Sequence, residues 1–369
     1  MRMVCDRVLL REIYLSNDRG FFQVFAWRDL ATTSSNPRHV CHTCVATAAL
    51  HSFKISLIPL SLSLFSKIAG ACKKMASGGQ DFPPKTQERL PGKEHAMDPT
   101  PDAFSADYKP ANKLRGKTAL VTGGDSGIGR AVCLHFAAEG ATVAFTYVKP
   151  DEQKDADETL RLINQHKADG AREPIAIATA DVGYEENCHK VVKEAASHFG
   201  GAIDILVNNA AEQYYPCDVT EISDEQLESV FRTNVFSYFF MTKFAVNHMK
   251  EGGSIINTTS VTAYRGSKKL LDYTATKAAI VGFTRSLALQ MVEKGIRVNA
   301  VAPGPGWTRL IPGSFSEVMV TEFGKAVPMR RAAQPTEIAP SYVFLACRED
   351  SSYITGQVIH PNGGEIVNG

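Results

Sequence analysis

The chain has 369 residues, of which 44% are hydrophobic, and a formal net charge of +1. This length can hold one large α/β domain with extensions, or two domains. The small net charge gives no reason to expect nucleic acid as a partner. The charge is unevenly distributed, because residues 1–74 carry ten Lys and Arg against four Asp and Glu, whereas the remainder carries 30 against 35. Eight widely spaced cysteines do not suggest a disulfide framework, so we expect a reducing compartment.

Residues 1–74 show no sustained helical or strand periodicity, and we expect them to be disordered and outside the folded domain. Residues 31–71 are rich in Ser and Thr and contain no acidic residue, which is typical of an organelle transit segment. The acidic residues that precede them do not fit that pattern, so the alternative is a non-native extension ahead of a start at Met75. The first interpretation places the protein in a plastid and the second places it in the cytoplasm.

Two patterns within this segment resemble a membrane span and a metal site, and neither is complete. The apolar run 55–65 contains Pro59 and is too short to span a bilayer, so we expect no membrane association. Cys41 and Cys44 form a CxxC pair, but no second pair follows downstream, so we expect no metal site.

A polar arm follows, from residue 75 to residue 114. Six prolines lie between Ala76 and Ala111, and the segment has little apolar content. We expect an extended arm that lies over the surface or is disordered, and not a second domain.

From residue 115 to residue 369, short apolar runs alternate with segments of helical periodicity. The first of them form a strand, a glycine turn, a helix and a second strand, which is a βαβ unit. Seven strands that alternate with helices predict one doubly wound α/β domain, a Rossmann fold with a seven-stranded parallel sheet. The expected strands are 117–122, 141–147, 174–178, 203–207, 254–258, 297–301 and 357–360, and the expected helices are 130–139, 151–168, 184–199, 224–250, 272–294 and 335–346.

Three glycines follow the first expected strand. Gly123 allows the turn out of the strand, whereas Gly127 and Gly129 let the backbone approach a pyrophosphate at the positive end of the next helix. The spacing G-x-x-x-G-x-G differs from the commoner G-x-G-x-x-G, and many glycine turns after strands are only turns. The position between a strand and a helix, at the head of the repeats, favours a dinucleotide site.

A candidate acid–base pair lies near the start of the expected helix 272–294. Tyr273 and Lys277 are four residues apart, so they share one helix face. A nearby cation stabilises a phenolate, and we therefore expect Lys277 to lower the pKa of Tyr273 and allow proton transfer at neutral pH. Ser260 follows the preceding strand and can bring a hydroxyl to the same point. A Tyr-x-x-x-Lys pair alone is more often an ordinary surface pair, and the upstream glycine turn is what favours catalysis.

The motifs occur in an order that resembles the short-chain dehydrogenases/reductases over residues 115–369. They are the glycine turn 122–129, Asp181-Val182, Asn208-Asn-Ala-Ala211, Asn234, Ser260, Tyr273-x-x-x-Lys277 and Asn299-Ala-Val-Ala-Pro-Gly304. Each motif is common by itself, whereas the ordered set is specific.

The resemblance implies a role for each position. Tyr273 would be the acid–base, Lys277 would also hold the nicotinamide ribose, and Ser260 would bind the carbonyl oxygen. Asn234 would hold a water that links Lys277 to solvent. The cofactor positions that the resemblance implies are Gly123, Ser126, Gly127, Ile128, Gly129, Tyr147, Lys149, Asp181, Val182, Asn208, Ala210, Tyr273, Lys277, Pro303, Gly304, Gly306 and Thr308.

The end of the second strand bears on the choice between NADP(H) and NAD(H). NAD-dependent enzymes place an acidic residue there to bind the ribose 2′-hydroxyl. This chain has Tyr147 instead, and Lys149 can meet a 2′-phosphate. Asp125 in the glycine turn and the nearby Asp151 argue in the opposite direction. We predict NADP(H), with NAD(H) as the alternative.

A narrower resemblance is to the plant and bacterial NADPH-dependent aldehyde reductases, some of which are described as glucose and ribitol dehydrogenases. It implies a small aldehyde or a sugar-derived carbonyl as substrate, and a homotetramer formed through the helices 224–250 and 272–294. The stretches that carry it are Pro91-Gly-Lys-Glu-His95, Ala144-Phe-Thr-Tyr-Val148, Ala210-Ala-Glu-Gln213, Leu271-Asp-Tyr-Thr-Ala-Thr-Lys277 and Tyr353-Ile-Thr-Gly-Gln with His360-Pro-Asn-Gly-Gly364.

Two other functions stay open. A 3-oxoacyl carrier-protein reductase shares the core motifs, and Arg330 and Arg331 are the candidate basic patch for its acidic carrier. A cofactor-binding protein without turnover is the alternative from another class, although it would not need Ser260, Tyr273 and Lys277 together.

One stretch departs from the family pattern. Relatives carry Ile or Val where this chain has Gly306, and this branch usually has Pro where this chain has Arg309. We expect Gly306 to loosen the loop at the nicotinamide end and Arg309 to add further freedom, so that Gly306→Ile would improve cofactor binding. The alternative is that the change is a harmless variant or a sequencing error.

Overall fold

The computed structural model describes residues 11–17, 20–26, 82–88, 90–215 and 218–367, which belong to two separate units. The first unit contains an antiparallel pair, β1 (Arg11–Asn17) and β2 (Gly20–Ala26). No strand or helix is predicted from the sequence in this segment, so the pair is an addition to the predicted elements. The Cys41-x-x-Cys44 pattern lies outside the described residues.

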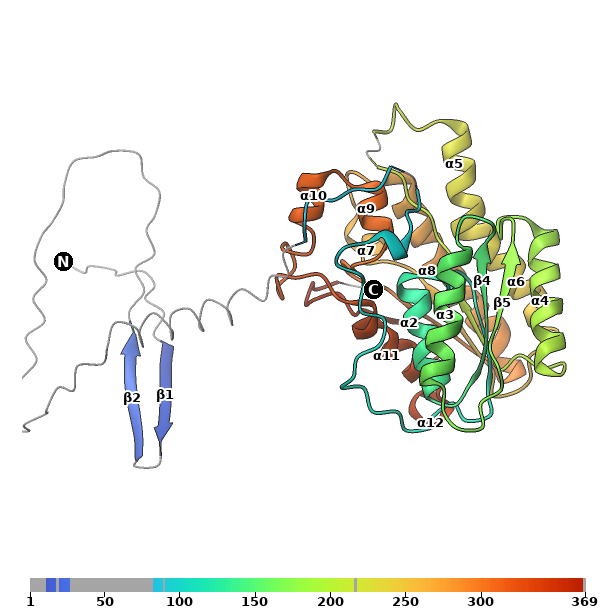
Figure 1. The fold of residues 1–369 in the computed structure, drawn as a ribbon, viewed down its shortest axis with the longest axis horizontal. Coiled ribbons are helices and arrows are strands. Elements are labelled where there is room, and N and C mark those ends of the chain that lie inside the picture. The colour runs from blue at the N-terminus through green and yellow to red at the C-terminus, as the bar shows by residue number, and fades with distance from the viewer. Residues whose placement is uncertain (1–10, 18–19, 27–81, 89, 216–217, 368–369) are drawn as a thin grey trace, which may run out of the picture. The chain divides into compact units, whose positions relative to one another are not determined.

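The second unit contains the predicted seven-stranded parallel sheet, which confirms the Rossmann fold (Figure 1). Its strand order is β5-β4-β3-β6-β7-β8-β9. Successive strands are added on one side of β3 up to β5 and on its other side from β6 onward, and this switch point opens a crevice at the carboxyl ends of the strands. The strands are β3 (Thr118–Val121), β4 (Thr142–Val148), β5 (Ile175–Thr179), β6 (Ile205–Asn208), β7 (Ser254–Thr258), β8 (Arg297–Val301) and β9 (Val358–Ile359).

Helices cover both faces of this sheet, because successive side chains of each buried strand point to opposite faces. Val121 packs in the core with α2 (Gly127–Ala138), α3 (Gln153–His166) and α11 (Pro335–Ala346). Its neighbour Leu120 packs in the other core. The helices of that second core are α4 (Glu185–Phe199), α6 (Ser237–Ala245) and α8 (Leu271–Met291).

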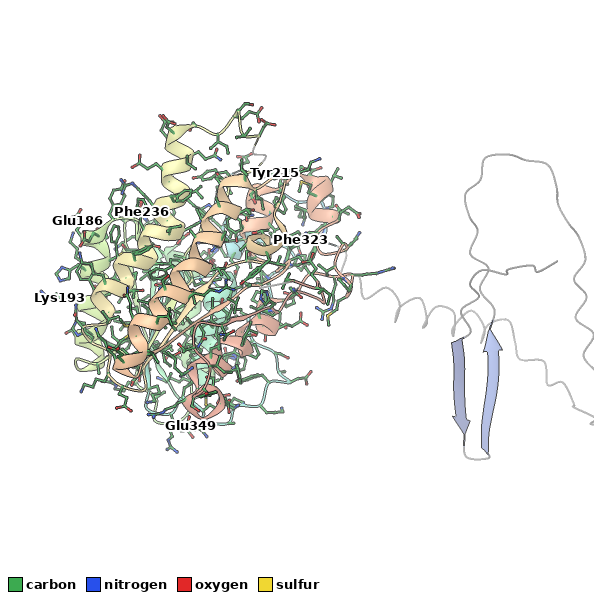
Figure 2. All side chains as sticks on the ribbon, turned by 180° about the vertical axis from the view of Figure 1, so that it is seen from behind. Glu186, Lys193, Tyr215, Phe236, Phe323 and Glu349 are labelled. Atoms are coloured by element: carbon green, nitrogen blue, oxygen red, sulfur yellow. The ribbon has the colours of Figure 1, made fainter. Side chains whose placement is uncertain are left out.

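The outer side of α4 faces solvent. Glu186 and Lys193 are exposed there and project away from the body of the unit (Figure 2). The remaining short elements of this unit are η1 (Glu94–Ala96), α7 (Thr262–Arg265), η3 (Val292–Lys294), α9 (Leu310–Ser314), α10 (Glu317–Thr321) and α12 (Arg348–Ser351).

The predicted helix 224–250 is divided into three parts. It begins with α5 (Asp224–Phe231), continues through a π-helical turn, η2 (Arg232–Phe236), and ends in α6. A π turn changes the backbone hydrogen-bond pattern of a helix, and such turns often occur at functional sites. Asn234, one of the predicted site residues, lies in this turn.

The polar arm lies over the surface of the second unit. The Phe82 ring stacks on Trp307 with 3.7 Å between ring centroids, and the Trp307 indole donates a hydrogen bond to the Pro99 carbonyl oxygen at 2.9 Å. Further along the arm, the Tyr108 hydroxyl donates to the Glu139 carboxylate at 2.5 Å. The described part of the arm is therefore attached to the second unit at several points.

Candidate active site

One cavity of about 730 Å³ lies at the carboxyl ends of the central strands. Ser260 lies two residues beyond the end of β7, and Tyr273 and Lys277 lie in the first two turns of α8. All three line the cavity. The cavity continues to the glycine turn between β3 and α2, so the predicted catalytic and cofactor residues share one space.

Burial dominates the acid–base properties of Tyr273 and Lys277. Burial raises the pKa of Tyr273 to about 12, and a hydrogen bond with Ser260 acts weakly in the opposite direction. Burial also lowers the pKa of Lys277 to about 7. The Lys277 Nζ lies 5.4 Å from the centre of the Tyr273 ring and donates a hydrogen bond to the Thr258 carbonyl oxygen at 2.9 Å. The expected lowering of the Tyr273 pKa is therefore wrong, because burial of the phenol raises its pKa more than the hydrogen bond with Ser260 lowers it.

Asn234 connects the π turn to the cavity wall. Its amide oxygen accepts a hydrogen bond from the Glu212 backbone N–H at 2.8 Å, and its amide nitrogen donates to the Glu212 carbonyl oxygen at 2.9 Å. The same nitrogen donates to the Thr276 hydroxyl at 3.1 Å, and that hydroxyl donates to the Tyr273 carbonyl oxygen at 2.6 Å. Asn234 thus ties Glu212 to the start of α8.

The glycine turn depends on the absence of side chains. Gly123 and Gly127 have φ values of +64° and +54°, which favour glycine. A Cβ on Gly129 would lie 2.0 Å from the Gly123 carbonyl oxygen, so only glycine allows α2 to begin this close to β3. Ser126, Gly127 and Ile128 line the cavity, so the N-terminus of α2 borders it, and a helix N-terminus is a position that favours phosphate groups.

Most of the predicted positions line the cavity, and four do not. Lys149 is exposed and lies outside the lining. The Asn208 amide is buried and donates to the Asn257 side chain at 2.9 Å, so it supports the ends of β6 and β7. Gly129 and Asn234 are buried and do not line the cavity either. The predicted positions that line the cavity are Gly123, Ser126, Gly127, Ile128, Tyr147, Asp181, Val182, Ala210, Ser260, Tyr273, Lys277, Pro303, Gly304, Gly306 and Thr308.

The loop after β8 is held in place, which contradicts the expected looseness. On one side of Gly306, the Trp307 N–H donates to the Ala333 carbonyl oxygen at 2.8 Å. On the other side, the Ala333 N–H donates to the Pro305 carbonyl oxygen, also at 2.8 Å. Backbone pairing on both sides therefore replaces the rigidity that a side chain at position 306 would give.

Arg309 is likewise fixed. Its side chain is 11% exposed and forms ion pairs with Asp125, at 3.1 Å, and with Glu152. Asp125 belongs to the glycine turn, and Glu152 precedes α3. The arginine therefore connects the loop after β8 to the glycine turn and to the start of α3, and the expected freedom of Arg309 is wrong.

A second group of buried charges lies beneath the glycine turn. Glu94, from the polar arm, is fully buried and pairs with Arg130 of α2 at 2.5 Å. The Glu94 carboxylate also accepts a hydrogen bond from the Gly127 N–H at 2.5 Å. Asp155 of α3 accepts hydrogen bonds from the backbone N–H groups of Glu94 and His95. The polar arm therefore supports the glycine turn through Glu94.

The opposite end of the cavity has both polar and aromatic walls. Gln213 donates a hydrogen bond to the Ser314 hydroxyl at 2.8 Å, and Arg265 pairs with Glu365 at 3.3 Å. Phe315 lines the cavity and contacts Tyr215 and Phe323, two rings that Figure 2 places at the same end of the unit. These walls suit a small substrate that carries both hydroxyl and apolar groups.

The comparisons with known proteins agree with this geometry. A family model described as enoyl-(acyl carrier protein) reductase matches residues 123–365. The structure of a short-chain dehydrogenase/reductase from Serratia marcescens aligns with a TM-score of 0.62 and 32% identity, over 68% of this chain and 98% of that chain. The chain belongs to the short-chain dehydrogenase/reductase family.

Relatives within the family confirm the narrower resemblance. A protein from Daucus carota described as glucose and ribitol dehydrogenase is 65% identical over 295 residues, which cover 80% of this chain and 100% of that protein. An Arabidopsis thaliana protein described as NADPH-dependent aldehyde reductase 1, chloroplastic, is 64% identical over 76% of this chain and 97% of its own length. A short-chain dehydrogenase from Burkholderia cenocepacia, solved in complex with NADP, aligns with a TM-score of 0.62 and 31% identity.

Three residues of this short-chain dehydrogenase/reductase site were not predicted from the sequence. Glu94 lies in the Pro91-Gly-Lys-Glu-His95 stretch, which the sequence analysis used only as a mark of resemblance. Glu212 lies in the Ala210-Ala-Glu-Gln213 stretch, which served only as a mark of resemblance too. Glu152 gave no signal, because a single acidic residue near a helix start is usually a solvated cap. Within the described residues, no group of His, Cys, Asp and Glu is arranged to hold a metal ion.

Proposed function

We propose that the protein is an NADP(H)-dependent oxidoreductase that reduces small aldehydes or sugar-derived carbonyls to alcohols. The observation that carries this proposal is that Ser260, Tyr273 and Lys277 line one cavity with the glycine turn of α2. The names of the Daucus carota and Arabidopsis thaliana relatives support the same reaction and substrate class.

The residues around the glycine turn fit a dinucleotide. A Cβ on Gly123 would lie 3.2 Å from the Ala210 Cα, and a Cβ on Gly127 would lie 3.1 Å from the Thr308 side chain. Ala210 and Thr308 therefore approach the backbone of the turn closely. Tyr147 and Asp181 would flank the adenosine portion of the cofactor. When bound, the nicotinamide supplies the hydride that reaches the carbonyl carbon.

The three catalytic side chains act on the carbonyl oxygen. As negative charge develops on that oxygen, the Ser260 hydroxyl donates a hydrogen bond to it and Tyr273 donates its proton. The pKa of Tyr273, raised to about 12, keeps the phenol protonated at neutral pH and ready for this step. Protonated Lys277 stabilises the phenolate that remains.

The test is the oxidation of NADPH against a panel of small aldehydes and open-chain sugars, with Tyr273→Phe as the control. The proposal predicts turnover of several of these aldehydes and a loss of at least about 10³-fold in kcat for the Phe variant, with cofactor binding retained. Phe activity above about a tenth of the wild-type value would show that Tyr273 is not the proton donor. Turnover of carrier-bound acyl chains alone would instead favour the 3-oxoacyl carrier-protein reductase, although Glu337 pairs with Arg331 in its candidate patch.

We further propose a homotetramer formed through α5, α6 and α8. Phe239 of α6 is 51% exposed and Leu289 of α8 is 77% exposed, and a partner subunit on these helices would cover both side chains. We also propose a plastid location, which the basic segment 1–74 and the chloroplast relative support. No helix in the described part of the chain is long and apolar enough to cross a bilayer.

A further inference from the structure

We propose that Arg309 determines the preference for the 2′-phosphate of NADP(H), by cancelling the negative charge of Asp125 and Glu152 at the adenosine end of the cavity. This inference rests on the proposed use of NADP(H). It assigns to Arg309 a role in specificity and no contact with the reacting atoms.

The adenosine end of the cavity is rich in carboxylates. In a doubly wound sheet, the 2′ position of the adenosine ribose lies at the end of the second strand, which here is β4 with Tyr147. Asp125, Asp151 and Glu152 line the cavity around that strand end. A 2′-phosphate carries close to two negative charges. This wall would therefore repel NADP(H) and tolerate NAD(H), unless a cation offsets the negative charge of the wall.

Arg309 is the cation that faces this wall within the described part of the chain. The other cations that line the cavity are Arg265 and Lys277, and they belong to the catalytic end. Lys149, which the sequence analysis assigned to the 2′-phosphate, is exposed and does not line the cavity. Arg130 is buried nearby but is engaged by Glu94 at 2.5 Å and by Asp155 at 3.7 Å.

The two carboxylates cannot easily turn away from the cavity. Glu152 accepts a hydrogen bond from the Val148 backbone N–H at 2.9 Å, which fixes its side chain against the end of β4. Asp125 is fully buried, and no donor among the described residues makes a hydrogen bond to either of its carboxylate oxygens. The ion pair with Arg309 at 3.1 Å is therefore the contact that offsets the charge of Asp125.

The position of Arg309 makes this role specific to the phosphorylated cofactor. A guanidinium is charged at every accessible pH and can serve two carboxylates at once. Without it, burial and mutual repulsion would favour protonation of one carboxylate, and the other would keep its negative charge in a buried wall, where screening by water is weak. NAD(H) carries no charge at the 2′ position, so removal of Arg309 should affect it far less than it affects NADP(H).

The experiment measures binding of two adenosine fragments to the full chain by calorimetry. The probes are 2′,5′-ADP, which carries the 2′-phosphate, and 5′-AMP, which lacks it, and neither requires turnover. Arg309→Met should weaken 2′,5′-ADP by tenfold or more and 5′-AMP by less than about twofold. Arg309→Lys should keep most of the affinity, and Arg309→Met combined with Glu152→Gln should recover part of it. Arg331→Met, at an exposed ion pair with Glu337, is the matched control and should change neither affinity.

One further variant keeps the test decisive. Asp125→Asn in the wild-type background should increase the preference for 2′,5′-ADP, and this variant leaves Arg309 paired with Glu152 if Arg309→Met does not fold. A wild-type preference for 2′,5′-ADP that survives Arg309→Met, or an equal loss for both probes, overturns the role of Arg309 alone. A wild type that binds both probes equally overturns the proposed use of NADP(H) as well.

Discussion

The carboxylate of Glu94 accepts a hydrogen bond from the backbone N–H of Gly127 at 2.5 Å, although the two residues lie 33 positions apart in the chain. Gly127 is the first residue of α2, and its N–H has no partner within the helix. Glu94 satisfies this donor and also pairs with Arg130, one turn further on. The arm therefore fixes the start of the helix whose N-terminus would receive the cofactor phosphates.

Glu94→Ala should reduce the free energy of unfolding by about 3–5 kcal/mol, because it leaves the buried Arg130 without its closest partner. The same change should weaken cofactor binding, since it frees the glycine turn. Denaturant unfolding followed by circular dichroism measures the first effect, and NADPH fluorescence titration measures the second.

Glu88 in the same arm supplies the matched control, because it is exposed. Glu88→Ala should change the free energy of unfolding by less than about 0.5 kcal/mol. Equal effects of the two substitutions would show that the arm contributes only as a surface covering.

The second prediction concerns pH. Burial lowers the pKa of Lys277 to about 7, whereas that of Tyr273 is raised to about 12. As the pH rises through about 7, Lys277 loses its proton and no longer stabilises the developing Tyr273 phenolate. The kcat/KM for aldehyde reduction should therefore be flat below about pH 7 and fall above it, and steady-state rates from pH 6 to 9 measure this.

Lys277→Arg tests the assignment, because arginine keeps its charge throughout this range. In this variant the fall near pH 7 should disappear, whatever the absolute rate. A fall that persists at the same pH would mean that another group titrates, and a flat wild-type profile would contradict the role of Lys277.

The sheet and most of the site could be predicted because their signals are local. Buried parallel strands read as short apolar runs, and the predicted bounds of β7, β8 and α11 agree with the structure. The Ser260, Tyr273 and Lys277 set occurs at fixed spacings within the sequence. These features need no knowledge of long-range contacts.

The remaining features depend on contacts that no local pattern encodes. Glu94 is one acidic residue in a polar arm, and only the folded chain brings it to α2. From the sequence, Arg309 was expected to add freedom to its loop, whereas the fold places Asp125 and Glu152 around it. The pKa of Tyr273 was predicted in the wrong direction because the spacing from Lys277 shows proximity and not the degree of burial.

The last prediction concerns Gly306. A Cβ at this position would lie 3.2 Å from the Ile338 Cδ1, and Ile338 is fully buried in α11. The backbone at Gly306 accepts an ordinary side chain, so the obstacle is this one methyl group. Gly306→Ile should overpack the contact, lower the free energy of unfolding by about 1–3 kcal/mol and fail to improve cofactor binding.

Ile338→Val removes the obstructing methyl group and should itself cost about 0.5–1.5 kcal/mol. Because the valine makes room for the new side chain, the double variant should be more stable than the sum of the two single changes predicts, by about 1 kcal/mol. A double-mutant cycle by denaturant unfolding measures this coupling. Strict additivity would mean that the loop after β8 moves away from α11 to accept the isoleucine, which would restore the looser loop that the sequence suggested.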